Sequence, residues 1–134
     1  MAKYARRTKV PVDRSRAELE RILTRYGATR FASGWDRGQV LVGFEMGGRA
    51  VKIAVPLSQH FSADRRNAIA RQRWRALILV VKAKLEAVDA GISTFEEEFL
   101  GQLVLPSGET VAQVLAGRLD ELPRALPAPK EDPA

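Results

Sequence analysis

The sequence predicts one α+β domain in which helices pack on a three-stranded antiparallel sheet. Three observations indicate this fold class: apolar residues that alternate between positions 40 and 55, a two-glycine turn within that region, and a long helical apolar period between about 62 and 90. A chain of 134 residues is the size of a single domain and can bury a core. Its hydrophobic fraction of 46% excludes disorder of the whole chain.

The first helix is expected to begin at Ser15 and to end at Gly27. Ser15 and Glu18 have the spacing of a capping box, in which each side chain satisfies a free amide of the first turn. Apolar residues follow at helical spacing, at Leu19, Ile22, Leu23 and Tyr26. Residues 1–14 are polar and basic, and we interpret them as a flexible arm before a domain that spans 15–122.

The three strands are expected over residues 29–35, 40–46 and 51–55. Alternation is clearest in the second and third strands, at Val40, Val42, Phe44, Met46, Val51, Ile53 and Val55. Gly47 and Gly48 between them predict a two-residue hairpin turn, because both central positions of such a turn need positive φ. Together the three runs predict an antiparallel meander.

The long helix is expected to begin at Ser62 or Asp64 and to end at Ala90, before Gly91. Its core-facing stripe consists of Trp74, Leu77, Ile78, Val81, Leu85 and Val88. Leu79 and Val80 point away from this stripe. We therefore expect a second element to cover them, either the last helix of the same chain or a protein partner.

The remaining residues predict short elements and a tail. A short helix is expected to open at Ser93 or Thr94, and residues 103–105 could add a short fourth strand. Thr110 and Gln113 form another capping box, which opens an amphipathic helix with apolar residues at Val111, Val114, Leu115, Leu119 and Leu122. Residues 123–134 are rich in proline and charge and are expected to be disordered.

Charge and composition narrow the classes of function. Residues 1–92 carry 19 basic and 8 acidic side chains, whereas residues 93–134 carry three basic and eight acidic ones. The absence of cysteine excludes disulfides, thiolate metal sites and cysteine nucleophiles, and the single histidine, His60, excludes a histidine metal cluster. No apolar run reaches membrane-spanning length, and no apolar segment of a secretory signal follows the basic N-terminus. We expect a cytoplasmic protein with no membrane partner and no cofactor.

The basic surplus predicts contact with the phosphate backbone of DNA or RNA. Arg71, Arg75 and Lys82 line one flank of the core stripe, and a second basic group lines the other flank. The candidate nucleic-acid-binding residues are Arg6, Arg7, Lys9, Arg65, Arg66, Arg71, Arg73, Arg75, Lys82 and Lys84. The alternative is that these side chains cover the margin of the core and pair with nearby carboxylates. A protein–protein module, monomeric or homodimeric, is the alternative function, with Leu79 and Val80 as its interface.

Two known architectures share the expected element order. One is the double-stranded RNA-binding domain, although the long helix here is longer and the glycine hairpin tighter than that domain needs. The other is the PD-(D/E)xK nuclease core, for which Glu45 and Lys52 would lie diagonally on one sheet face. Ala50 occupies the position where that motif requires a carboxylate, so a cross-strand ion pair is the simpler interpretation. With no Ser-His-Asp arrangement and no phosphate-binding glycine loop, the sequence disfavours an enzyme.

Three segments resemble a family of small uncharacterised proteins encoded by bacteriophages and prophages. They are KYARRTKVPVDRSRAELERILTRYGATRF, VGFEM and RQRWRALILVVKAKLEAVDAGISTFEEEFLGQLVLPSGETV. The resemblance covers most of residues 3–112, whereas the stretch between Pro56 and Arg71 and the final residues depart from it. It implies a phage accessory protein in the cytoplasm of a bacterial host, with a host or phage protein as a further partner. It implies no activity and no site residues.

Overall fold

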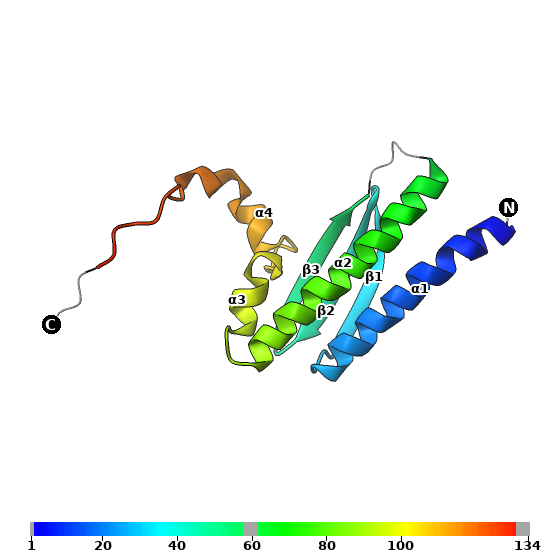
Figure 1. Cartoon of the computed structure of the whole chain (residues 1–134). Helices are drawn as coiled ribbons and strands as arrows, with labels where there is room; N and C mark the ends of the chain where they lie inside the picture. The colour runs from blue at the N-terminus through cyan, green and yellow to red at the C-terminus, as the bar shows by residue number, and fades with distance from the viewer. Residues whose placement is uncertain (1, 58–61, 131–134) are drawn as a thin grey trace.

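The structure, a computed structural model, describes residues 2–57 and 62–130, and the side chains from residue 13 onward (Figure 1). Its elements in chain order are α1 (Ala2–Arg25), β1 (Arg30–Asp36), β2 (Gln39–Met46), β3 (Arg49–Pro56), α2 (Ala63–Asp89), α3 (Phe95–Phe99), the 3₁₀ helix η1 (Leu100–Gln102), α4 (Val111–Leu115) and the 3₁₀ helix η2 (Ala116–Glu121). The predicted α+β fold is therefore confirmed.

The sheet is an antiparallel meander in the order β1-β2-β3. Its register pairs Phe31 and Val51 with Phe44 from either side. Gly47 and Gly48 close the second hairpin with φ of 59° and 74°, as the sequence predicted. Both long helices lie side by side on the same face of the sheet and run in the same direction (Figure 1).

The helix α1 is longer than expected, because it begins at Ala2 instead of Ser15. The segment 1–14, which we expected as an arm, forms the first turns of this helix from Ala2 onward. Ser15 and Glu18 therefore lie inside the helix and do not cap it. The residues before Pro11 include alanine, lysine and arginine, which favour a helix, and Pro11 costs one backbone hydrogen bond without ending it.

One hydrophobic core lies between the sheet and the two long helices. Buried residues come from α1 (Leu19, Ile22, Leu23), the strands (Val40, Val42, Phe44, Met46, Val51) and α2 (Ala70, Trp74, Leu77, Ile78, Val81, Leu85). This set agrees with the apolar stripes predicted for each element, except that Ile53 and Val55 are only partly buried against the core and Val88 is half-buried outside it. Phe99 of α3 completes the core and is fully buried, although the sequence pattern did not single it out.

The cap residues of the later helices follow the sequence closely. Ser62 caps α2 and its hydroxyl accepts a hydrogen bond from the amide of Arg65. Thr94 caps α3, with the complete reciprocal capping box to Glu97. Hydrogen bonds from the backbone and the side chain of Thr94 lower the pKa of the exposed Glu97 carboxyl below its ordinary range.

The segment after α3 differs from the expected fourth strand. Leu103 makes a single antiparallel bridge with Val51 at the free edge of β3, and the chain then turns back so that Val104 bridges Thr110. The predicted capping box of Thr110 and Gln113 is present. The helix that follows is α-helical only to Leu115 and continues as 3₁₀, since Gly117 has a low helix propensity.

The last helical segment does not cover the outer side of α2. Leu79 and Val80 are 68% and 50% exposed, so the expected second cover within the chain is absent from the described residues. Residues 123–130 have no regular secondary structure and lead away from the sheet (Figure 1). Within the described part of the chain, no helix has the length and apolar character that crossing a membrane requires.

Candidate nucleic-acid interface

The parallel arrangement of α1 and α2 brings two basic segments to the same end of the molecule. The N-terminal half of α1, with residues 1–16, carries six basic and one acidic side chain. The first half of α2, residues 63–75, carries five basic and one acidic side chain. Because both helices start at this end (Figure 1), their positive dipole ends add to the charge. We call this region the basic end.

The candidate nucleic-acid-binding residues lie in different parts of the basic end. Arg6, Arg7 and Lys9 belong to the first turns of α1, and their side chains lie outside the described part of the structure. Arg65 and Arg66 are exposed in the first turn of α2. A cluster of cations beside two helix N-termini attracts anions such as phosphate groups.

Arg71, Arg75 and Lys82 lie on the flank of α2 that is turned toward α1. The opposite flank carries Lys84, which contacts α3 on the other side of α2. Arg75 and Lys82 are exposed and Arg71 is half-buried. None of the three forms an ion pair with a carboxylate among the described residues. Glu86 and Asp89, the nearby carboxylates of α2, form no ion pair with them within the described part of the chain, so these charges are available to a ligand.

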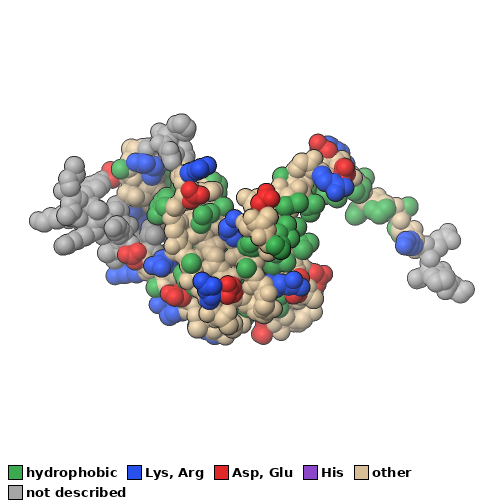
Figure 2. Space-filling view, turned by 180° about the vertical axis from the view of Figure 1, so that it is seen from behind, with side chains coloured by type: hydrophobic (Ala, Val, Ile, Leu, Met, Phe, Trp, Pro, Cys, Tyr) green, Lys and Arg blue, Asp and Glu red, His purple; other side chains and the backbone are tan. Residues whose placement is uncertain are grey.

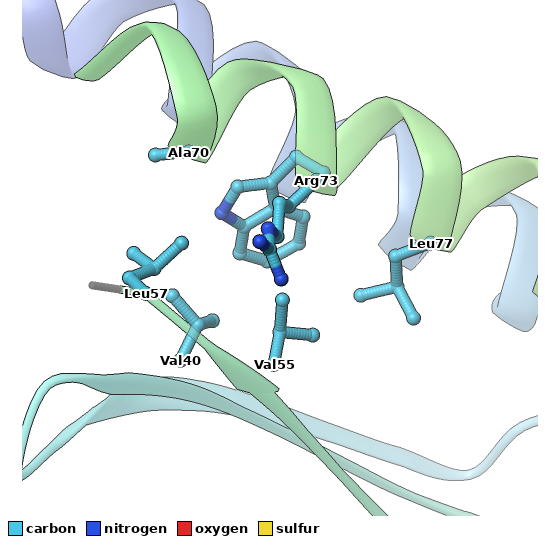
Figure 3. Close-up of a pocket in the computed structure, with 7 residues that line it drawn as sticks. Val40, Val55, Leu57, Ala70, Arg73 and Leu77 are labelled. Carbon is cyan, nitrogen blue, oxygen red and sulfur yellow. The ribbon is translucent and has the colours of Figure 1, made fainter. Parts of the chain in front are cut away.

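Arg73 on the other flank has a structural role as well. Figure 3 shows its side chain reaching from α2 toward Val55 of β3, beside Leu57 and Leu77. It borders a small apolar gap between α2 and the sheet that also touches Trp74. Arg73 is exposed as a residue although its side chain borders this gap, so it covers the margin of the core.

Lys84 is engaged within the fold. Its ammonium group donates a hydrogen bond of 2.8 Å to the carbonyl of Glu98 and lies 3.7 Å from the carboxylate of the same residue. It also sits 5.8 Å from the ring centre of Phe99. These contacts tie α2 to α3. They match the core-margin interpretation, and Lys84 is not part of the interface that we propose below.

An exposed tryptophan adds a feature that the sequence did not identify. Trp35 stands at the end of β1, 66% exposed, and lines a cleft of about 220 Å³ with Arg16, Asp13 and Trp74. The pairing of Trp35 with Val40 places it on the helix side of the sheet, at the basic end. Its position directly before the turn at Asp36 was the available signal, because a strand-terminal residue lacks neighbours to cover it.

Both long helices lie on one face of the sheet (Figure 1), and Figure 2 views the molecule from the opposite side. Small residues alternate onto the opposite face of the sheet, at Ala32, Gly34, Gly43, Ala50 and Ala54. A shallow hollow of about 260 Å³ lies above Ala32, Gly43 and Ala50, bordered by Arg30, Glu45, Lys52 and Val104.

Glu45 and Lys52, the two residues considered above for a nuclease site, border this hollow. Glu45 and Lys52 have the predicted register, opposite Ala50 and Gly43. Glu45 pairs with Arg30 at 3.3 Å, and Lys52 donates a 2.9 Å hydrogen bond to the carbonyl of Gly108. Each therefore already has a partner within the chain. Among the described residues, no group of three carboxylates or imidazoles could hold a metal ion. His60 lies outside the described residues.

Comparisons with protein families, with curated proteins and with solved structures return no match to this chain.

Proposed function

We propose that the protein binds nucleic acid without base-specific readout, through its basic end, as a phage-type accessory protein. The supporting observation is that Arg66, Arg71 and Arg75 of the basic end, and Lys82 further along α2, form no ion pair within the described residues, although α2 carries three carboxylates. Unpaired cations on one surface are costly in self-repulsion and are typical of surfaces that bind phosphate.

A salt titration tests this proposal. The full chain is titrated at low salt against single-stranded DNA, duplex DNA and duplex RNA, and the titration is repeated at increasing salt. Because phosphate contacts release counterions, log affinity should fall linearly with log salt, by about 0.7 to 0.9 per phosphate neutralised. If none of the three ligands binds at about 50 mM salt, where such contacts are strong, the proposal is wrong.

Because Trp35 is exposed, we expect single-stranded DNA to bind more tightly than the positive charge of the basic end alone would allow. Unstacked bases can stack on an exposed indole, which contributes about 1–3 kcal/mol per base. Trp35→Ala should therefore weaken binding to single-stranded DNA by that amount and affect duplex binding much less. Trp35→Phe, which keeps an aromatic ring, is the matched control and should retain most of the affinity.

The same prediction has a direct optical readout. Trp74 lines the same cleft but is only 4% exposed, so a base can stack directly only on Trp35, and the Trp35→Phe variant separates the two emissions. Quenching by single-stranded DNA that persists unchanged in Trp35→Phe would contradict stacking at this site.

A second candidate function is a non-enzymatic protein–protein module. The exposed pair Leu79 and Val80 favours it, because two large apolar residues on the outer side of a helix usually have a partner. Leu79 lies four residues after Arg75 and three before Lys82, so the two functions would use neighbouring side chains of the same helix.

A further inference from the structure

The cleft beside Trp35 lies where α1, α2 and the sheet meet at the basic end. Its volume is about 220 Å³. The indole of Trp35 forms one wall, and Trp74 lies at its buried side. Its polar side chains are Asp13 and Arg16 of α1 and Ser33 of β1. The cleft therefore combines an aromatic surface with a carboxylate, a guanidinium and a hydroxyl, which can fix the orientation of a ligand.

Asp13 is the single acidic residue among residues 1–16, which also carry six basic ones. Its side chain is exposed, and it forms no ion pair with Arg16 or with another cation among the described side chains. A carboxylate on a surface that binds phosphate repels the nucleic-acid backbone, so Asp13 opposes the binding that its basic neighbours favour. A ligand group that donates hydrogen bonds to Asp13 would offset this repulsion.

The nucleobases differ in what they offer to a carboxylate. An ionised carboxylate only accepts hydrogen bonds, and its two oxygens are best matched by two parallel donors. Guanine has two adjacent donors, N1–H and N2–H, on its Watson–Crick edge. Adenine and cytosine each place an acceptor nitrogen beside their amino group, and thymine has one N–H between two carbonyls. Guanine is therefore the base whose edge matches Asp13 with both oxygens.

We infer that the cleft binds one unpaired guanine of a single-stranded nucleic acid. The base stacks on Trp35 while the carboxylate of Asp13 accepts hydrogen bonds from N1–H and N2–H. The hydroxyl of Ser33 can donate to guanine O6, and Arg16 contacts a flanking phosphate.

This inference rests on the proposed function, because the basic end must bind the strand for the cleft to receive a base. It adds a preference at one nucleotide to binding that is otherwise independent of sequence. A guanine in a duplex offers its Watson–Crick edge to cytosine, so duplex DNA should show no such preference.

Strands that differ by one base test this inference. The full chain is titrated at low salt against a short oligothymidine and against strands in which guanine, adenine, cytosine or hypoxanthine replaces the central thymine. Hypoxanthine is guanine without the 2-amino group, so it offers one of the two donors. We expect the guanine strand to bind about tenfold more tightly than oligothymidine, and the hypoxanthine strand to lie between them.

Asp13→Asn separates the carboxylate from the rest of the cleft. The variant loses a negative charge near the phosphates, so its affinity for oligothymidine should rise. Its amide group replaces one acceptor with a donor, so the guanine advantage should fall to about twofold or less. Glu18→Gln is the matched control, because it removes the same charge from an exposed position of α1 outside the cleft. It should keep the guanine advantage, and circular dichroism confirms that both variants fold.

Several results would overturn the inference and leave the proposed function intact. They are equal binding of the guanine and thymine strands, equal binding of the guanine and hypoxanthine strands, and a guanine advantage that survives Asp13→Asn. Free guanosine monophosphate that binds as tightly as the guanine strand would mean that the cleft takes a nucleotide and not a strand. If no strand binds at all, the proposed function fails and this inference fails with it.

Discussion

Replacing Phe99 by Ala is expected to lower the free energy of unfolding by about 3–5 kcal/mol, the usual cost of removing a fully buried phenylalanine. The ring is 0% exposed and packs edge-on against Phe44, with ring centres 5.6 Å apart. It also contacts Phe95 at 4.9 Å. Because Phe44 belongs to β2, loss of Phe99 would loosen the contact between the sheet and α3 as well as leave a cavity.

Chemical denaturation monitored by circular dichroism measures this effect. Leu100→Ala is the matched control, since Leu100 is the next residue along the chain and is 54% exposed. It should change the free energy of unfolding by no more than about 0.5 kcal/mol. An equally small effect of Phe99→Ala would mean that α3 does not pack on the sheet in solution.

Removing the charges of Arg71 and Arg75 together should weaken nucleic-acid binding on all sequences alike. We expect Arg71→Gln with Arg75→Gln to flatten the salt dependence of duplex DNA binding by about two phosphate contacts, at about 0.9 each. Between about 50 and 200 mM salt, the wild type would then lose about tenfold more affinity than the variant. Glutamine keeps most of the side-chain length, so the half-buried stem of Arg71 stays largely packed.

The control for this pair removes the same charge elsewhere. Arg118→Gln with Arg124→Gln changes the net charge equally, but both arginines lie close to the C-terminus, where they pair with Glu121 and Asp120. If the two double variants lose affinity and salt dependence to the same extent, binding follows net charge and not the basic end. If neither variant changes binding, the arginines of α2 serve the fold alone.

Structural features whose physical cause lies in a few neighbouring residues could be predicted from the sequence. The strands, the glycine hairpin and the caps at Ser62, Thr94 and Thr110 depend on alternation, positive φ or a side chain that satisfies an amide three residues away. The core stripe of α2 follows in the same way from helical spacing. Each of these features is stabilised locally, so the sequence around it contains the physical cause.

The prediction was wrong where a sequence motif is compatible with two structures. The spacing of Ser15 and Glu18 fits a capping box, but the same pair is compatible with the interior of a helix, and α1 begins at Ala2. Residues 103–105 have a strand-like composition, yet only one bridge joins them to β3. Whether such a segment extends the sheet depends on where the flanking parts of the chain pack.

Only the tertiary structure decided which surfaces are used and which remain open. Lys84 looked like its basic neighbours in the sequence, but the fold places it against Glu98 and Phe99. The shared end of α1 and α2, the exposure of Trp35 and the uncovered outer face of α2 all result from how distant segments pack. Charge and apolar character are properties of single residues and can be read from the sequence, whereas burial and pairing depend on partners that are distant along the chain.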